Sequence, residues 1–489
     1  MNSGLKKTIW LVVGGILVSA LAVVWLQRQQ GADGKQAVAD QKARMRAAGF
    51  KTELSEFSVT IDPATRARMA TLMFLPESIS FGPQQDPLDF LPVTSNGVAI
   101  TVWKQARLAG ADGPLQWSDL HAALDTNDEA LEQACVAAIS GPIQFDLDLS
   151  ISGNWTEHLS ALNHLSRALG SRVVLQLHDN RPDAAWTNLL AMTRLATAWA
   201  PDPRPLSFLL RSLVVRSAFQ CTWQALQAGQ WPDEQLAALQ REWQTVDFFT
   251  NLSEAIAGGR SELLNDCELE AGLKPFADLS WSHLFRRGKG DDPYTWGDLR
   301  NDLDLIRFRS SEAYAEELQV LTNSWDRTTE ITRARPFTTW AELRRLPMMT
   351  NRAPFHLAYR PLAPFTESLA QGDVEAILAV GDAEAHRRVA VVAIALKRYR
   401  GQHGDYPKSL SALAPEYLDP VPPDFIDGQP LRYRVTDDGH FVLYSIGLDG
   451  VDDGGKMSLP GPEIISKDKD GFFLGPSNVD IVWPRPAAE

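Results

Sequence analysis

The chain has 489 residues and a formal net charge of −14, which argues against nucleic acid and anionic lipid headgroups as partners. Its 44% hydrophobic content and 15 tryptophans can fill sizeable cores, and a chain of this length is expected to form roughly two or three domains. The three cysteines, Cys135, Cys221 and Cys267, rule out a disulfide framework, and their spacing fits no zinc pattern. We therefore interpret them as buried free thiols.

Residues 9–26 form an uncharged apolar run that follows Lys6 and Lys7. At the usual helical rise this run spans roughly 27 Å, close to the thickness of a bilayer core. Because flanking lysines stay in the cytoplasm, residues 1–27 are predicted to be an uncleaved single-pass anchor, with all later residues outside the cytoplasm. A cleaved signal peptide is the alternative, since residues 18–20 resemble a small-residue cleavage site, but the apolar run continues beyond them.

Residues 28–153 are predicted to form a linker or helical stalk followed by a mixed α/β segment. Residues 58–63 and 97–103 are typical of short strands. Residues 117–139 favour two helices, with Ser118 and Asn127 as candidate N-caps.

Residues 154–371 carry the strongest helical pattern and are predicted to form an α-helical domain. Apolar residues recur at helical spacing over residues 159–177, 186–199, 206–214 and 236–246, with Pro- or Gly-containing breaks between them. Short breaks between amphipathic helices predict helical hairpins. The third helix is expected to begin with the apolar residues Leu206, Leu209, Leu210, Leu213 and Val214 and to end at Gly229.

Residues 372–489 are predicted to form a small α+β domain. Apolar residues over 385–400 indicate a helix that is buried on most of its circumference and therefore needs a sheet to pack on. A short helix is expected over residues 408–418. Residues 431–445 alternate about an Asp-Gly pair and predict a hairpin, and residues 480–483 predict a closing strand.

An acidic loop follows the hairpin, with Asp449, Asp452 and Asp453 placed among glycines. Calcium takes about six to eight oxygen ligands from carboxylates and backbone carbonyls of flexible loops, and this loop offers both. A solvated Asp-Gly turn is the alternative.

The order of these elements in the last part of the chain resembles the extracytoplasmic domain of the major pseudopilin of type II secretion systems. The resemblance implies a long helix on a small antiparallel sheet and a calcium site in the loop. Asp449 matches the first loop ligand and Asp480 matches the acidic residue at the closing strand, so Asp449, Asp452, Asp453 and Asp480 are the candidate metal ligands. An insertion over residues 456–479, with Asp468 and Asp470, departs from the family. The helical region loosely resembles uncharacterised bacterial envelope proteins that carry such a tail.

The expected fold is α+β: a transmembrane helix, a large helical-hairpin domain and a small pseudopilin-like domain. The expected function is non-enzymatic, that of an interaction or structural protein in a bacterial inner membrane, accessory to a type II secretion or pilus-like assembly whose envelope proteins are its partners. The prepilin peptidase signature is absent around residues 4–7, which argues against an ordinary filament subunit. An extracytoplasmic hydrolase with its site in the helical domain is the alternative, and Asp146 and Asp148 could be paired carboxylates, although a solvated strand face explains them equally well.

Overall fold

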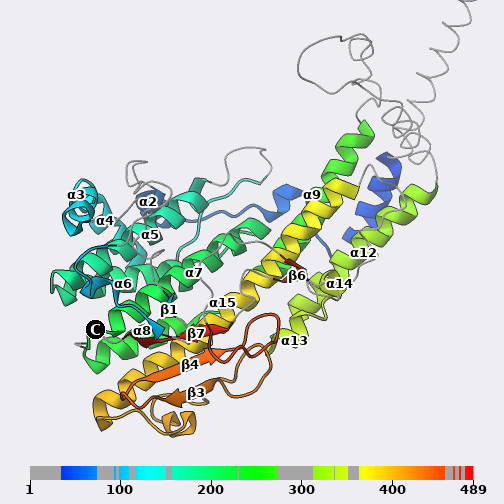
Figure 1. Cartoon of the computed structure of the whole chain (residues 1–489). Helices are drawn as coiled ribbons and strands as arrows, with labels where there is room; N and C mark the ends of the chain where they lie inside the picture. Colours follow the sequence, from blue (N-terminus) through cyan, green and yellow to red (C-terminus); the bar gives the residue numbers. More distant parts are fainter. Residues whose placement is uncertain are drawn as a thin grey trace, which may run out of the picture. The chain divides into compact units, whose positions relative to one another are not determined.

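The computed structural model describes residues 35–73, 93–94, 98–108, 116–149, 157–229, 231–272, 312–334, 336–350, 363–456, 466–467, 473–474 and 480–487 (Figure 1). The predicted anchor over residues 9–26 lies outside these residues, as do Asp468 and Asp470. Within the described ranges, no helix has the length and apolar character needed to cross a membrane. The chain divides into two compact units, and each is described by itself.

The first unit comprises Met1–Phe57, Ile256–Glu330 and Asn351–Gln371. Its described elements are helical residues 35–47, the short helix η1 (Leu54–Phe57), and parts of α9 (Leu252–Gly272), α12 (Glu312–Ala334) and α15 (Ala363–His403). Arg260 is fully buried there, with its guanidinium 4.9 Å from the ring centre of Phe50 and hydrogen-bonded to Asp326 and the Lys51 carbonyl. Burial raises the pKa of Asp326, against the influence of Arg260. This unit therefore has a partly polar helical core.

The second unit comprises Ser58–Ala255, Ile331–Thr350 and Gly372–Glu489, and it is mainly helical with small sheets, as an α+β fold requires. Its shorter helices are α2 (Pro63–Met73), η2 (Val102–Lys104), α3 (Trp117–Asp125), α4 (Asp128–Ile139), α13 (Trp340–Leu343), α14 (Pro347–Thr350) and η3 (Leu410–Leu413). Its longer helices are α5 (Glu157–His178), α6 (Pro182–Thr197), α7 (Pro205–Leu226), α8 (Asp233–Thr245) and residues 372–403 of α15 (Ala363–His403). The helices α5, α6 and α7 pack on one another, as the predicted run of hairpins requires.

The two short helices over residues 117–139 are confirmed, but one predicted cap is wrong. Ser118 lies inside α3, whose N-cap is Gln116, and Gln116 and Asp119 form a reciprocal capping box. Asn127 does precede α4, although its side chain makes no capping hydrogen bond.

The predicted third helix is present as α7, but most of the apolar residues at its start do not form its buried face. Leu206 is 37% exposed, whereas Phe208, Phe219 and Trp223 are buried. Buried polar residues also line this helix, among them Arg211 and Thr222. Because neighbours cover α7 on several sides, its burial does not follow one apolar stripe.

The predicted strands before residue 150 are much shorter than expected. Residues 58–63 contribute one isolated bridge, between Val59 and Leu147. Residues 97–103 contribute β2 (Val98–Ala99), which pairs antiparallel with β1 (Val93–Thr94) and parallel with β8 (Arg485–Pro486) before the chain turns into η2.

The longest helix, α15, has 41 residues and starts well before the predicted residue 385. Every residue over 376–396 is buried except Arg387, which confirms burial on most of the helix circumference. Gly404 follows the helix with φ +86°, a conformation that suits glycine at a helix end.

The predicted hairpin and closing strand are confirmed. The strands β3 (Arg432–Val435), β4 (Phe441–Ser445) and β7 (Ile481–Trp483) form an antiparallel sheet in the order β3-β4-β7. Tyr433 faces Leu443, which in turn faces Trp483. A further pair, β5 (Ser466–Lys467) and β6 (Phe473–Leu474), lies in the insertion.

Helix α15 packs between the helical region and the sheet (Figure 1). Phe219 of α7 contacts both His386 of α15 and Trp483 of β7 edge-on. Trp223 of α7 donates its indole N–H to the carbonyl of Pro484 at 2.7 Å. The predicted boundary at residue 372 falls inside α15. Within the second unit, α7 of the predicted helical domain packs against His386 and Trp483 of the predicted tail. Independent folding of residues 372–489 stays a prediction.

Cys135 and Cys221 are buried and outside any disulfide, as predicted, while the side chain of Cys267 lies outside the described residues. Burial raises the pKa of Cys135 to about 12, so this thiol is protonated and unreactive at neutral pH.

Candidate functional site

The acidic loop after β4 is held in place by Asp480, which is only 4% exposed. One carboxylate oxygen of Asp480 accepts the N–H of Gly455 at 2.7 Å, and the other accepts the N–H of Asp453 at 3.4 Å. Gly455 has φ +77°, and a β-carbon there would lie 3.2 Å from the ring of Tyr444. The structure thus brings Asp480 to the loop, where it receives backbone N–H groups. Burial raises the pKa of Asp480, and these hydrogen bonds counteract the rise.

The side chains of Asp449 and Asp452 in the loop also accept hydrogen bonds. Asp449 accepts the N–H of Val451 at 3.0 Å. Asp452 accepts the N–H of Gly454 at 2.9 Å and the hydroxyl of Tyr444 at 3.2 Å. These local bonds fold each carboxylate back onto the chain, in the manner of an Asx-turn.

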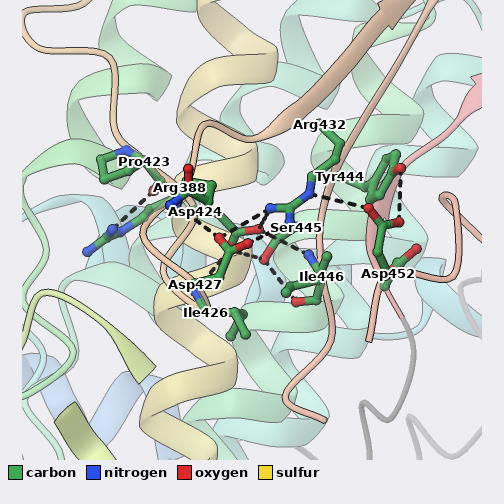
Figure 2. Close-up of polar contacts among 12 residues, drawn as sticks. Arg388, Pro423, Asp424, Ile426, Asp427, Arg432, Tyr444, Ser445, Ile446 and Asp452 are labelled. Carbon is green, nitrogen blue, oxygen red and sulfur yellow. Dashed lines mark hydrogen bonds and ion pairs between the residues drawn. The ribbon is translucent and has the colours of Figure 1, made fainter. Parts of the chain in front are cut away.

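Arg432, the first residue of β3, contacts three carboxylates at once (Figure 2). Its Nη1 lies 2.8 Å from Asp424 Oδ2 and its Nη2 lies 2.5 Å from Asp427 Oδ2. Its Nε lies 3.5 Å from Asp452 Oδ2. A guanidinium has five N–H donors in a planar fork, so it can serve several acceptors in one plane. Arg432 therefore connects the turn over residues 424–428 to the acidic loop.

Asp424 is fully buried and accepts four hydrogen bonds. Besides Arg432, the donors are the backbone N–H groups of Ile426 and Ile446 and the hydroxyl of Ser445, the last at 2.6 Å. Burial raises the pKa of Asp424, and the hydrogen bonds oppose that rise. The carboxylate is thus positioned by both the turn and β4.

Asp427 and Arg432 form an ion pair, and each favours the charged form of the other. Partial burial opposes ionisation of Asp427, but the hydrogen bonds from Arg432 and from the Gln429 N–H lower the pKa of Asp427 below its usual value. The hydrogen bond to Asp427 in turn raises the pKa of Arg432. Arg432 is therefore a permanent positive charge at this point of the fold.

Helix α15 and residues 338–340 also contact the turn over residues 424–428 and its neighbours. Arg388 donates to the carbonyls of Pro423 at 3.0 Å and Thr338 at 3.2 Å, and it stacks 5.0 Å over the ring of Phe425. Trp340 donates its backbone N–H to Phe425 and its indole N–H to Leu448 at 2.9 Å. The turn, the acidic loop and α15 therefore form one connected polar framework.

The described residues do not fit a calcium site as they are arranged. Calcium requires several oxygens that face the ion, whereas Asp480 accepts backbone N–H groups on both of its oxygens and Asp452 lies beside a guanidinium. Across the described ranges, no three His, Cys, Asp or Glu side chains are grouped so that they could hold a metal ion. The ligand set Asp449, Asp452, Asp453 and Asp480 is therefore not assembled, and calcium binding stays a prediction.

Sequence reasoning missed Asp424, Asp427 and Arg432, because the segment before the hairpin carries no helical or strand pattern. A weak signal was present: two aspartates flank a Phe-Ile pair just before a glycine. Burial gives Asp424 its importance, and burial here comes from α15 and Trp340, which lie far away in the sequence.

The helical region contains a buried His–Asp pair that bears on the hydrolase alternative. His158 Nε2 lies 2.7 Å from Asp202 Oδ2, and its ring packs against Phe145. The hydroxyl of Ser207 donates to the backbone carbonyls of Asp202 and Arg204. A histidine that could act as a base and a carboxylate that orients it are thus present. The Ser207 hydroxyl, however, donates to backbone carbonyls and not to the imidazole of His158.

Asp146, one of the two carboxylates considered for hydrolysis, is bound by other residues of the chain. Asp146 forms an ion pair with Arg66 at 2.6 Å and accepts the N–H of Ile61, while Asp148 is exposed. Asp146 therefore has a structural partner of its own.

Searches of protein-family models, of curated proteins and of solved structures found no match to this chain.

Proposed function

We propose that this chain is an interaction or structural protein, anchored by residues 9–26 in a bacterial inner membrane, and an accessory component of a type II secretion or pilus-like assembly. The observation that carries the proposal is the packing of α15 with the antiparallel sheet β3-β4-β7 and the loop tied to Asp480. The same order of elements gives the tail its resemblance to pseudopilins. Without the prepilin peptidase signature, an accessory role is favoured over that of a filament subunit.

The chemistry of the tail supports a binding role over a catalytic one. The charged groups of the network around Asp424 satisfy one another, and Arg432 is bonded to carboxylates of the same chain. Catalysis requires a reactive group that is presented to a substrate. A framework whose charges are internally paired is better suited to hold a surface rigid.

The test is site-specific photo-crosslinking from the surface of the tail in living cells. Val435 and Val451 are 43% and 53% exposed, so a benzoylphenylalanine at either position should not disturb the core. Val136 on α4 is 58% exposed and provides a matched control in the helical region. We expect crosslinks from residues 435 and 451, but not 136, to components of a secretion or pilus-like assembly. Crosslinks to unrelated proteins, or none from either tail position, would contradict the proposal.

The hydrolase alternative rests on the buried pair of His158 and Asp202. It predicts that the purified full chain turns over ester or amide substrates and that His158→Gln abolishes the turnover while the chain stays folded. Such a result, together with an absence of crosslinks from the tail, would replace the structural role with an enzymatic one.

A further inference from the structure

We propose that the guanidinium of Arg432 is the cation that joins the turn over residues 424–428 to the acidic loop over residues 448–455, so that this loop is ordered without calcium. The proposal does not depend on the partner proposed above, because it concerns only contacts within the tail.

The first support is the position of Arg432 among carboxylates from two separate segments. Asp424 and Asp427 belong to the turn before β3, and Asp452 belongs to the loop after β4. Arg432 contacts carboxylates of both segments, and only 22% of its side chain is exposed. The contacts with Asp424 and Asp427 are charge-assisted hydrogen bonds, which are about twice as strong as neutral ones, and the contact with Asp452 is an ion pair. Bridging two segments is the role that a bound cation would otherwise play.

The second support is that Arg432 and a calcium ion compete for the same oxygen atoms. Asp452 Oδ2 faces Arg432 Nε, and Asp452 Oδ1 accepts from Gly454 and Tyr444. A divalent ion at Asp452 would stand close to a permanent positive charge, and like charges at such short range repel strongly. Calcium could bind there only after Arg432 had moved away from Asp452.

The third support is that the rest of the loop is closed by backbone donors. Asp480 receives the N–H groups of Asp453 and Gly455. Gly455 packs closely against Tyr444 of β4, so this part of the loop lies on β4. The acidic residues are therefore stabilised by N–H groups at one end and by Arg432 at the other.

The experiment is hydrogen exchange on the full chain, read by mass spectrometry in millimolar calcium and in chelator. For the unchanged protein we expect equal exchange in peptides covering residues 446–456 in both conditions. Arg432→Gln should speed exchange in those peptides and in residues 424–429 by about tenfold or more, because bonds to charged groups are lost at both segments. Arg434→Gln is the matched control, since Arg434 is exposed and lies on the same strand.

Arg432→Lys separates charge from geometry. A lysine keeps the positive charge but cannot contact three carboxylates in one plane, so an intermediate rate is expected. Slower exchange of residues 446–456 in calcium than in chelator for the unchanged protein, removed by Asp449→Ala, would overturn the proposal. So would an Arg432→Gln variant that exchanges like the unchanged protein. The calcium comparison uses the unchanged protein and Asp449→Ala, so it is decisive even if Arg432→Gln does not fold.

Discussion

Gly381 of α15 lies directly beneath the indole of Trp340. A β-carbon at Gly381 would lie 3.0 Å from Trp340 Cε3 and 3.5 Å from Leu448 Cδ2. The indole cannot easily retreat, because Trp340 is only 3% exposed and is hydrogen-bonded to Phe425 at 2.7 Å and Leu448 at 2.9 Å. The change Gly381→Ala must therefore push apart the contact that ties α15 to the turn and the acidic loop.

Two opposing terms set the size of the effect. Alanine is favoured over glycine in a helix by up to about 1 kcal/mol. Overpacking a fixed contact in a core costs about 1–3 kcal/mol. We expect Gly381→Ala to lower the free energy of unfolding by about 1 kcal/mol. At Gly372 of the same helix, a β-carbon would meet only Pro205, at an ordinary 3.7 Å, so Gly372→Ala should stabilise the protein instead.

The assay is urea unfolding of the full chain followed by tryptophan fluorescence, with a lower midpoint and an unchanged slope expected for Gly381→Ala. Trp340→Phe removes the ring atoms that a β-carbon would meet, so it should reduce the penalty in the double variant. If Gly381→Ala raised the midpoint as Gly372→Ala does, the close packing of Trp340 on α15 would be refuted.

Three further results are expected. Burial lowers the pKa of His386 below its usual value, so protonation favours the unfolded chain and stability should fall as the pH drops below about 6.5. His386→Gln should flatten that part of a plot of urea midpoint against pH, and an unchanged plot would contradict this. Gly455→Ala should destabilise more than Gly450→Ala in urea unfolding, because both glycines have positive φ but only Gly455 also faces Tyr444; equal losses would contradict the contact. A topology reporter fused after Glu489 should be active outside the cytoplasm, and activity only inside it would refute the predicted anchor orientation.

Features that depend on short stretches of chain could be predicted from the sequence. Residues 159–177 repeat apolar side chains at helical spacing and form α5. The Asp-Gly pair at residues 438–439 lies between two alternating segments and joins β3 to β4. The burial of α15 over residues 385–396 could also be predicted, because an apolar pattern on most sides of a helix has no stable exposed arrangement.

Features that depend on distant residues were decided by the tertiary structure. The buried face of α7 is set by its neighbours, and it accepts Arg211 while leaving Leu206 exposed. The network around Asp424 joins residues from a turn, two strands, a loop and α15, and no local pattern records that they meet. A carboxylate in the sequence shows its charge but not its burial or the donors that will surround it. The sequence predicts calcium in the acidic loop, and the tertiary structure adds that the guanidinium of Arg432 lies 3.5 Å from Asp452 of that loop.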